Sequence, residues 1–478
     1  MEEHAQDPTP SQDDNLVTKV SGTRPIDSEE EGLNTRLPDK GTRPRVGMRN
    51  SLRLVFSWHN YRIYLLTAWV FSAFTSIWSF FNLYLLAIGW QYLTIGAAST
   101  FVGALAAVSR LVGGYVGDSV DRKKLSVIAM MMAAVYHIII GLFTDFTLIL
   151  VGLTILATMD IAKGGSSAYI MENIPKEDSG LALSLFTAGR SLGIVVLVAF
   201  GALMTVMEFG SGLRLMYLVA GVSLLLCTLV RERYLSSSKK RQRPSGVSLW
   251  QDFLHENRHA ARLLLSVMPG VLLVVIVDAL SDAIFQFGAL LYAKEYLGVS
   301  ISGITVIVLV PLIVSVPLLV KVGRVSDRRG VRRAAFGVYS VMPVCAALLM
   351  LAPVFPYWMP APIVELAETA VTGLSVVFST PFLAIVMKDV NDVLWGLVLI
   401  TLIQKKLPIR DTAKILAVFW FVVYLFASIG PFVGGLVFTY AQPSQLFAIV
   451  LILNLIILGM ITKVGLVAAN AEEVPTAR

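Results

Sequence analysis

The apolar residues of this chain come in blocks of about 20, separated by short polar stretches. A helix needs about 20 apolar residues to cross roughly 30 Å of hydrocarbon. With 56% hydrophobic and 15% charged residues and a mean hydropathy of +0.73, the chain has more apolar surface than a soluble core can bury. These features exclude an ordinary water-soluble enzyme. They predict an all-α, polytopic protein of the lipid bilayer.

Twelve apolar blocks can be placed, and a polar linker at 232–261 divides them into two sets of six. The first set is 61–88, 95–117, 125–143, 146–172, 179–205 and 213–231. The second set is 263–293, 301–322, 333–352, 386–407, 412–439 and 444–466. We therefore predict two six-helix bundles, at 56–231 and 262–466, and a C-terminal tail at 467–478.

Two segments fall outside this pattern. Residues 1–55 are polar and rich in Pro, Gly, Asp and Glu, so that they cannot bury enough apolar surface to fold. They also lack the short apolar core of a signal peptide, and we expect a disordered tail that stays in the cytoplasm. Residues 353–385 contain several prolines and two glutamates, and we expect them to form an insertion outside the membrane that partly re-enters it.

Positive charge is distributed as in a membrane topology signal. The net charge of +7 comes from short Lys and Arg clusters between apolar blocks, not from one basic surface, which argues against nucleic acid as a partner. Every second loop is basic, whereas the others hold little beyond Arg214 and Lys294. Because basic loops stay inside, twelve crossings with both termini in the cytoplasm are expected, in a plasma-membrane protein that we expect to be monomeric.

Three motifs recur in the two halves, which indicates duplication. The clearest pair follows the second and eighth blocks, where Gly-x-x-x-Asp precedes a run of cations. The first copy comprises Gly114, Asp118 and Arg122, and the second comprises Gly323, Asp327, Arg328, Gly330 and Arg332. Together with the two halves and the basic linker, these loops resemble the major facilitator superfamily of secondary transporters. The resemblance implies two bundles related by a pseudo-two-fold axis, and it covers about 61–466.

The repeated loop also has a physical interpretation. Glycine at 114 and 323 would let helices approach closely, and the aspartates would accept hydrogen bonds at a helix N-terminus. The cations that follow could pair across the halves and close the cytoplasmic face. The alternative is that they are topology markers only. We favour the gate because a bare cation run would need no fixed glycine and aspartate.

Charges inside apolar blocks are expensive and normally face a bundle interior or a wet cavity. Asp278 and Asp282 share one face of the seventh helix, and repulsion between them would favour protonation near neutral pH. They and Asp160 are our candidates for proton coupling. The alternative is that each acid is held by a cation or a hydrogen-bonding partner.

A second group of residues is expected to line a central cavity. The resemblance implies this, because the first, fourth, seventh and tenth helices of the major facilitator superfamily surround such a cavity. Arg190 is a candidate counter-charge for Asp160 or for an anionic solute, whereas Lys163 could simply pair with Asp160. The cavity candidates are Arg190, Lys163, Trp78, Asn82, Gln286 and Asp392.

No nucleotide loop, metal-ligand cluster or catalytic motif is visible in the sequence, so no cofactor, metal or catalytic residue is predicted. The pattern predicts a secondary active transporter that moves a small organic solute by alternating access, driven by protons, with a lean towards efflux. Uptake of an organic anion or a sugar-like solute, proton-coupled or facilitated, stays open. So does a non-transporting sensor or scaffold with the N-terminal tail as its partner-binding element.

Overall fold

Helices make up nearly all of the chain that the computed structural model describes, which is residues 56–172, 182, 185–186, 188–237, 249–329, 331–370, 373–406 and 412–463. Nine described helices are long and apolar enough to cross a membrane, and two shorter apolar segments lie at 189–203 and 301–315. α16 (Thr380–Lys406) has the length but carries Lys388, Asp389 and Asp392 in its middle. The described helices therefore supply one segment for each predicted block.

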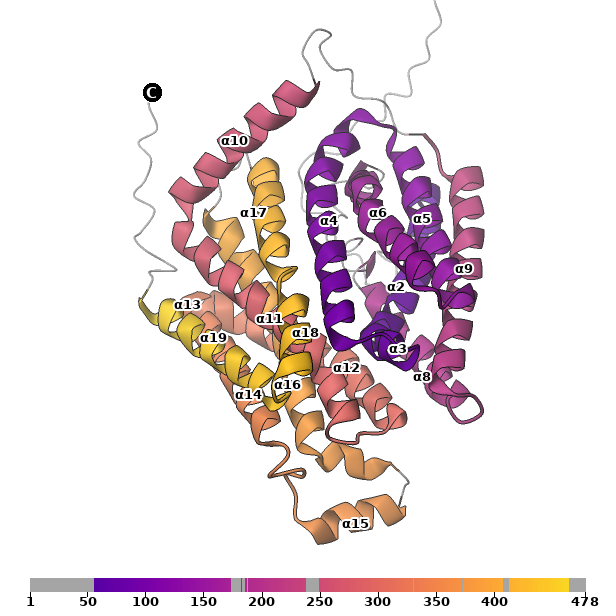
Figure 1. Ribbon diagram of the computed structural model, residues 1–478. Helices are drawn as coiled ribbons and strands as arrows, with labels where there is room; N and C mark the ends of the chain where they lie inside the picture. Colours follow the sequence, from indigo (N-terminus) through magenta and orange to yellow (C-terminus); the bar gives the residue numbers. More distant parts are fainter. Residues whose placement is uncertain are drawn as a thin grey trace, which may run out of the picture. The chain divides into compact units, whose positions relative to one another are not determined.

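The first half of the described chain forms one bundle, in which α4 packs on α6, and α5 packs on both α6 and α9 (Figure 1). The first predicted block is not one regular helix, because a 3-10 stretch, η1, interrupts it. Such a stretch inside a helix often marks a hinge or strain. The elements are α2 (His59–Phe74), η1 (Thr75–Phe80), α3 (Phe81–Ala87), α4 (Tyr92–Ser119), α5 (Arg122–Leu142), α6 (Phe146–Glu172), η3 (Gly189–Leu192), α8 (Gly193–Leu203) and α9 (Phe209–Tyr234).

The second half forms the other bundle, in which α11 contacts α17, α18 and α19, and α16 contacts α12 and α14. The predicted ninth and eleventh blocks are each divided, at Ser340 and near Ser428. The elements, besides α16, are α10 (Leu249–Val267), α11 (Pro269–Glu295), α12 (Ile301–Arg329), α13 (Val331–Tyr339), α14 (Val341–Leu351), α15 (Ala361–Ala370), η4 (Leu374–Phe378), α17 (Thr412–Ala427), α18 (Gly430–Tyr440) and α19 (Ser444–Lys463).

The linker region differs from the prediction. The chain is already helical from Leu249, inside the stretch expected to be a polar linker, and α10 ends at Val267, inside the block expected to be one helix. Pro269 starts α11 because proline has no N–H for the preceding helix but suits the first turn of a new one. α10 is amphipathic: Phe253 and Leu264 are buried, whereas Arg258 is exposed. A surface helix therefore leads into the seventh membrane block.

The segment between α14 and α16 contains α15 and η4. It is closed on itself by an antiparallel bridge between Tyr357 and Ser379. Glu368 accepts hydrogen bonds from the backbone N–H groups of Gly373, at 2.9 Å, and Ser375, at 3.3 Å. Hydrogen bonds from the Ser375 side chain and the Gly373 backbone lower the pKa of the Glu368 carboxyl. Gly373 has φ of +85°, a conformation that glycine adopts without strain.

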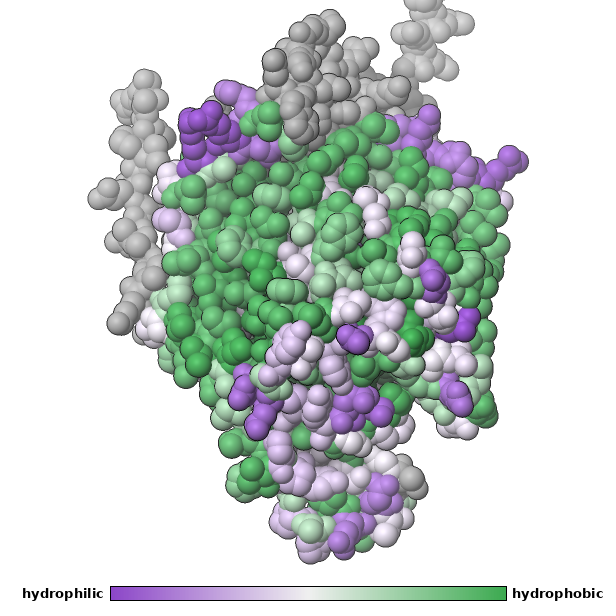
Figure 2. Space-filling model, in the orientation of Figure 1, coloured by the Kyte–Doolittle hydropathy of each residue, from purple (hydrophilic) through white to green (hydrophobic). Residues whose placement is uncertain are grey.

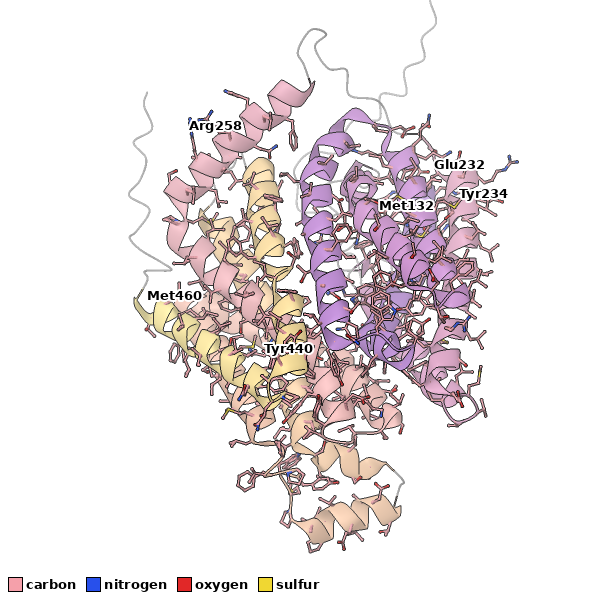
Figure 3. The ribbon with its side chains drawn as sticks, viewed as in Figure 1. Met132, Glu232, Tyr234, Arg258, Tyr440 and Met460 are labelled. Carbon is pink, nitrogen blue, oxygen red and sulfur yellow. The ribbon has the colours of Figure 1, made fainter. Side chains whose placement is uncertain are left out.

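The surface agrees with a membrane protein. In Figure 2, apolar residues cover much of the visible face, and hydrophilic residues gather towards its upper edge and lower part. Arg258 on α10 and Glu232 near the end of α9 lie at the upper end of the helices (Figure 3). Many large apolar side chains are exposed, including Val195, Val206 and Leu226 at 67%, 78% and 58%. Lipid would cover such surfaces, whereas water would not tolerate them at this density.

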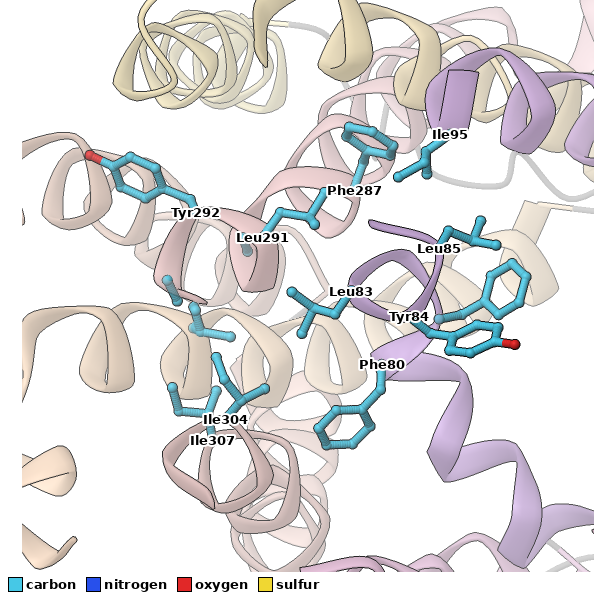
Figure 4. Close-up of a cluster of buried hydrophobic side chains, with 14 of the residues drawn as sticks. Phe80, Leu83, Tyr84, Leu85, Ile95, Phe287, Leu291, Tyr292, Ile304 and Ile307 are labelled. Carbon is cyan, nitrogen blue, oxygen red and sulfur yellow. The ribbon is translucent and has the colours of Figure 1, made fainter. Parts of the chain in front are cut away.

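A hydrophobic core joins the two bundles near one end of the helices. It contains Leu83 and Ile95 from the first half and Phe287, Leu291 and Ile304 from the second (Figure 4). These residues lie next to the loops at 88–91 and 296–300, which the charge pattern predicts to be outside. The other buried clusters each belong to one bundle, apart from Leu111 of α4, which packs against the cluster of the second half. Apolar packing therefore closes the space between the bundles mainly at the predicted outer end.

Candidate functional site

A cavity of about 630 Å³ lies between the two bundles, next to the hydrophobic core that joins them. Both halves of the chain contribute to its wall. Its polar, charged and aromatic lining residues are Phe71, Phe74, Thr75, Trp78, Ser79, Phe81, Asn82, Ser99, Arg110, Tyr136, His137, Asp160, Lys163, Tyr217, Gln286, Phe287 and Asp389. The cavity candidates Trp78, Asn82, Lys163 and Gln286, and the acid Asp160, are therefore placed in one wall.

A charged group on α4 and α6 forms part of this wall. Arg110 Nε donates a hydrogen bond to Asp160 Oδ2 at 2.6 Å, and Lys163 Nζ lies 3.9 Å from Asp160 Oδ1. The Arg110 guanidinium also stacks on the Tyr424 ring of α17, 3.7 Å from its centroid. Arg110 therefore contacts both bundles, through an ion pair in its own half and a cation–π contact in the other.

Of the two partners expected for Asp160, the structure shows Lys163 but not Arg190. Arg190 was a candidate counter-charge, but it is exposed in η3 and is not among the residues that line the cavity in the described chain. Arg110 takes that place instead. Asp160 is buried, at 6% exposure, and its carboxylate is neutralised by a neighbouring helix rather than by the fifth predicted block.

Aromatic side chains form a second part of the wall in the first bundle. Trp78 stacks on Phe81 with ring centroids 4.7 Å apart, yet is 45% exposed. Tyr136 and Tyr217 are buried behind it; their hydroxyls interact with each other, and neither has another hydrogen-bond partner within the described residues. His137 Nδ1 donates to the Ala133 carbonyl at 2.7 Å, which ties this ring to its own helix.

In the second bundle, Asp278 of α11 is enclosed by polar partners. It accepts hydrogen bonds from Tyr339 Oη at 2.9 Å and from Trp395 Nε1 at 2.7 Å. Asn454 of α19 joins the same network. Its Oδ1 accepts from Ser281 at 2.9 Å and lies 3.0 Å from Tyr339 Oη, whose one proton it shares with Asp278. Asp278 is buried, at 9% exposure, so both of its oxygens are satisfied without a cation.

One turn along α11, Asp282 contacts a buried cation. Lys388 Nζ of α16 donates to Asp282 Oδ1 at 2.6 Å and also to Asp392, one turn further along its own helix. Gln286 Nε2 lies 3.3 Å from both Asp389 and Asp392. Four carboxylates of α11 and α16, those of Asp278, Asp282, Asp389 and Asp392, thus lie near one another. Among the described residues, Lys388 contacts two of them, Asp282 and Asp392.

Three predicted acids lie behind the cavity rather than on it. Asp278, Asp282 and Asp392 are not among its described lining residues, whereas Gln286 and Asp389 are. Because Gln286 donates to both Asp389 and Asp392, it connects the cavity wall to the Lys388 group. A change of charge on Asp392 can therefore reach the cavity through one side chain.

The predicted gate is described only in part. The structure does not describe Gly330 or the packing around Gly323. It also does not describe the side chains of Asp118, Asp327, Arg328 and Arg332. Arg122 begins α5, where Asp121 caps the helix through the Lys123 N–H at 2.9 Å. A Cβ at Gly114 would meet open space, which corrects the expectation of a close contact there. The close approach is at Gly113, whose Cβ would lie 2.6 Å from the Asp160 carbonyl oxygen.

Sequence reasoning did not identify some residues of the site. Arg110 carried the signal used for the other charges, since it lies inside an apolar block. Tyr339 and Asn454 gave no such signal, because single tyrosines and asparagines are common in membrane helices. Asp389 carried the same signal as Asp392, since both lie inside one apolar block.

Comparison with known proteins gives the fold. A model of the Major Facilitator Superfamily matches residues 63–394. No curated protein sequence is significantly similar to the chain. Among solved structures, the nucleoside transporter NupG superposes with a TM-score of 0.61 at 12% identity, covering 84% of this chain and 98% of that chain.

Two further solved structures have similar values. A POT family transporter in complex with 5-aminolevulinic acid gives a TM-score of 0.63 at 10% identity, covering 84% of this chain and 94% of that one. A variant of the peptide transporter POT in complex with alafosfalin gives 0.59 at 14% identity, covering 86% and 95%. At such identities the likeness shows the fold, which confirms the predicted fold class.

Proposed function

Because this chain belongs to the Major Facilitator Superfamily, we propose that it is a secondary active transporter that moves a small organic solute by alternating access. The observation that carries the proposal is the cavity of about 630 Å³ between the two bundles. Ligand pockets for small molecules typically enclose about 300–1,000 Å³ and combine apolar walls with a few polar groups. The cavity has both, and both bundles contribute to it.

The structure supports a cytoplasm-facing state in this cycle. Apolar packing joins the bundles near the loops that the positive-inside rule assigns to the outside. Towards the basic loops, α4 and α17 are the main pair of described helices that joins the bundles. Both termini would lie in the cytoplasm, in a plasma-membrane protein that can act as a monomer.

Protons are our proposed driving ion. In the described chain, the Asp282 and Asp392 carboxylates contact the Lys388 ammonium and those of Asp278 and Asp389 lie near it, so full ionisation would leave this group with an excess of three negative charges in the membrane interior. Such an excess is expensive in a low dielectric, and binding of protons relieves it. Asp278 is the deepest of them and the preferred carrier, with Asp282 beside it. Asp160, paired with Arg110, is the less favoured carrier.

Two directions of transport have support in the wall of the cavity. Its aromatic surface and its two acids, Asp160 and Asp389, suit the efflux of amphiphilic solutes. Lys163, whose side chain is 51% exposed, suits the uptake of an organic anion. Efflux is our first choice. Uptake is the second candidate because Lys163 is placed in the wall.

Reconstituted vesicles test the proposal. Vesicles that enclose the pH-sensitive dye pyranine should show proton movement when a transported member of a panel of organic solutes is added. Asp278→Asn should abolish proton-driven accumulation but keep exchange of solute down its own gradient, because the amide cannot release a proton. Asp145→Asn, at a helix cap outside the cavity, is the matched control and should behave as wild type.

The outcomes separate the two parts of the proposal. Full gradient-driven accumulation in the Asp278→Asn variant removes Asp278 from coupling but leaves transport intact. If no solute in the panel moves in wild-type vesicles in either direction, the protein is not a transporter of this kind.

A further inference from the structure

The accessible aromatic surface of the cavity lies in the first bundle. Trp78 and Phe81 are parallel to within 9°, and Tyr136 lies 6.1 Å from Trp78, ring centroid to ring centroid. Tyr217 contacts Phe81, Tyr136 and His137 in turn. Trp78 covers Phe81 on one side and is 45% exposed, so a flat ring of a solute can stack on it.

A pair of hydroxyl groups next to this surface lacks one acceptor. Tyr136 and Tyr217 are each 1% exposed and line the cavity. Their hydroxyls interact with each other, and no other group in the described part of the chain accepts from either, so one of the two protons has no acceptor. A buried hydroxyl without an acceptor destabilises the protein. A bound solute with acceptor atoms on or near its ring would remove this destabilisation.

The charge that a solute meets in this half is positive. The Asp160 side chain is 8% exposed and forms an ion pair with Arg110. The Lys163 and Arg110 side chains are more accessible, at 51% and 39% exposure. Together the three carry a net charge of +1. The one other charged lining residue of the described chain, Asp389, belongs to the opposite bundle and accepts a hydrogen bond from Gln286.

The distance between the Trp78 ring and the positive charge sets the length of a solute that can reach both. Lys163 Nζ lies 5.7 Å from the centroid of Phe71, which precedes Trp78 by seven residues on the same block. At 1.5 Å per residue in α2 and 2.0 Å in η1, that corresponds to about 12 Å along the block. A solute that reaches both features therefore has its ring and its charge about 10 Å apart.

We propose that the cavity binds an aromatic organic anion, with its ring on Trp78, acceptor atoms at Tyr136 and Tyr217, and its anionic group at Lys163 and Arg110. The inference rests on the proposed transport function for its biological meaning, although binding itself can be measured without transport. It names a solute class, and it holds for either direction of movement.

Binding to the purified full-length protein tests this assignment, with three probes of equal length: 6-phenylhexanoate, 6-phenylhexylamine and 6-cyclohexylhexanoate. Titration calorimetry, with thermal stabilisation as a second readout, should rank 6-phenylhexanoate about tenfold tighter than either of the others. Trp78→Leu and Lys163→Gln should each weaken its binding about tenfold. Tyr136→Phe combined with Tyr217→Phe should weaken binding of an acceptor-bearing ring, 6-(4-nitrophenyl)hexanoate, about fivefold.

Matched controls carry the same changes elsewhere. Trp358→Leu, in the segment between α14 and α16, and Lys294→Gln, at the end of α11, should leave binding unchanged. Trp78→Phe keeps a ring and should retain most of the affinity, which separates loss of stacking from loss of folding.

The assignment is overturned if the amine or the cyclohexyl acid binds as tightly as 6-phenylhexanoate, if none of the probes binds, or if the cavity variants match their controls. If these results occur while vesicles still show solute-dependent proton movement, the solute class is wrong and the transport function stands. If vesicles show no transport either, both proposals fail.

Discussion

At the scale of single residues, Lys388 is the cation on which the second bundle depends. Its side chain is 3% exposed, its ammonium contacts the Asp282 and Asp392 carboxylates, and Nζ lies 5.1 Å from the centroid of the Phe285 ring. Removing one partner of a buried pair leaves an uncompensated charge, which costs far more than the intact pair contributes. Lys388 therefore supplies the ion pair between α11 and α16, beside the hydrogen bonds from Trp395 to Asp278 and from Gln286 to Asp389 and Asp392.

Lys388→Met should lower the free energy of unfolding by about 3 kcal/mol. This is the lower end of the range for breaking a buried ion pair, because Asp282 is partly exposed. Combining it with Asp392→Asn should restore part of the loss, since one of the unpaired charges is then absent. Thermal unfolding of the purified protein measures both effects. Lys294→Met, at a surface pair with Glu295 at 4.0 Å, is the control and should change stability by less than about 0.5 kcal/mol. Equal effects at the two lysines would contradict the structural role of Lys388.

At the scale of elements, the contact between α4 and α18 depends on glycine. A Cβ at Gly96 would lie 2.4 Å from the Pro431 carbonyl oxygen, and one at Gly435 would lie 2.8 Å from the Tyr92 carbonyl oxygen. The backbones meet there without side chains between them, as small residues allow in membrane helices. The glycines at 430, 434 and 435 of α18 favour such a thin surface, but the sequence alone does not indicate that its partner is α4 of the other bundle.

Gly96→Ala should destabilise the protein by about 1–3 kcal/mol, because the methyl group forces α4 away from Pro431. Gly459→Ala, in α19, is the matched control, since a Cβ there meets nothing within 4 Å. That change should be neutral or stabilising by up to about 1 kcal/mol, as alanine favours the helix. Chemical unfolding in detergent compares them, and equal stability of the two variants would show that α4 and α18 do not need this approach.

Helix positions could be predicted from the sequence because apolar length is a strong, local signal. Breaks inside the blocks could not, since η1, the division at Ser340 and the separation of α10 from α11 depend on packing and on one proline. For the site, Asp160, Lys163, Trp78, Asn82 and Gln286 could be named from polarity at helical depth. Which charges meet could not, because Arg110 and Asp160 lie 50 residues apart and only the fold brings them together.

At the scale of the whole described chain, α8 and α12 close one side of the outer end. Phe200 and Ile304 are fully buried there in the core that joins the bundles. A Cβ at Gly201 would lie 3.8 Å from Thr305 Cγ2, which places these two positions within reach of a disulfide. Alternating access requires this contact to break in each cycle.

The pair Gly201→Cys with Thr305→Cys should therefore lose at least about nine-tenths of its transport when oxidised and recover it with a reductant. The native thiols of Cys227 and Cys345 are buried and should not compete. The two single variants, treated with the same oxidant, are the controls, and solute flux in vesicles is the measurement. Undiminished flux in the cross-linked protein would show that the outer end need not open here.

The unequal charge of the bundles has an electrical consequence. Four carboxylates and one ammonium reside on α11 and α16, whereas Arg110, Asp160 and Lys163 nearly balance in the other bundle. A charge that shifts across the full membrane field does work of about 2.3 kcal/mol per 100 mV. If the second bundle tilts while its acids are ionised, membrane voltage biases the two orientations, and each bound proton weakens that bias.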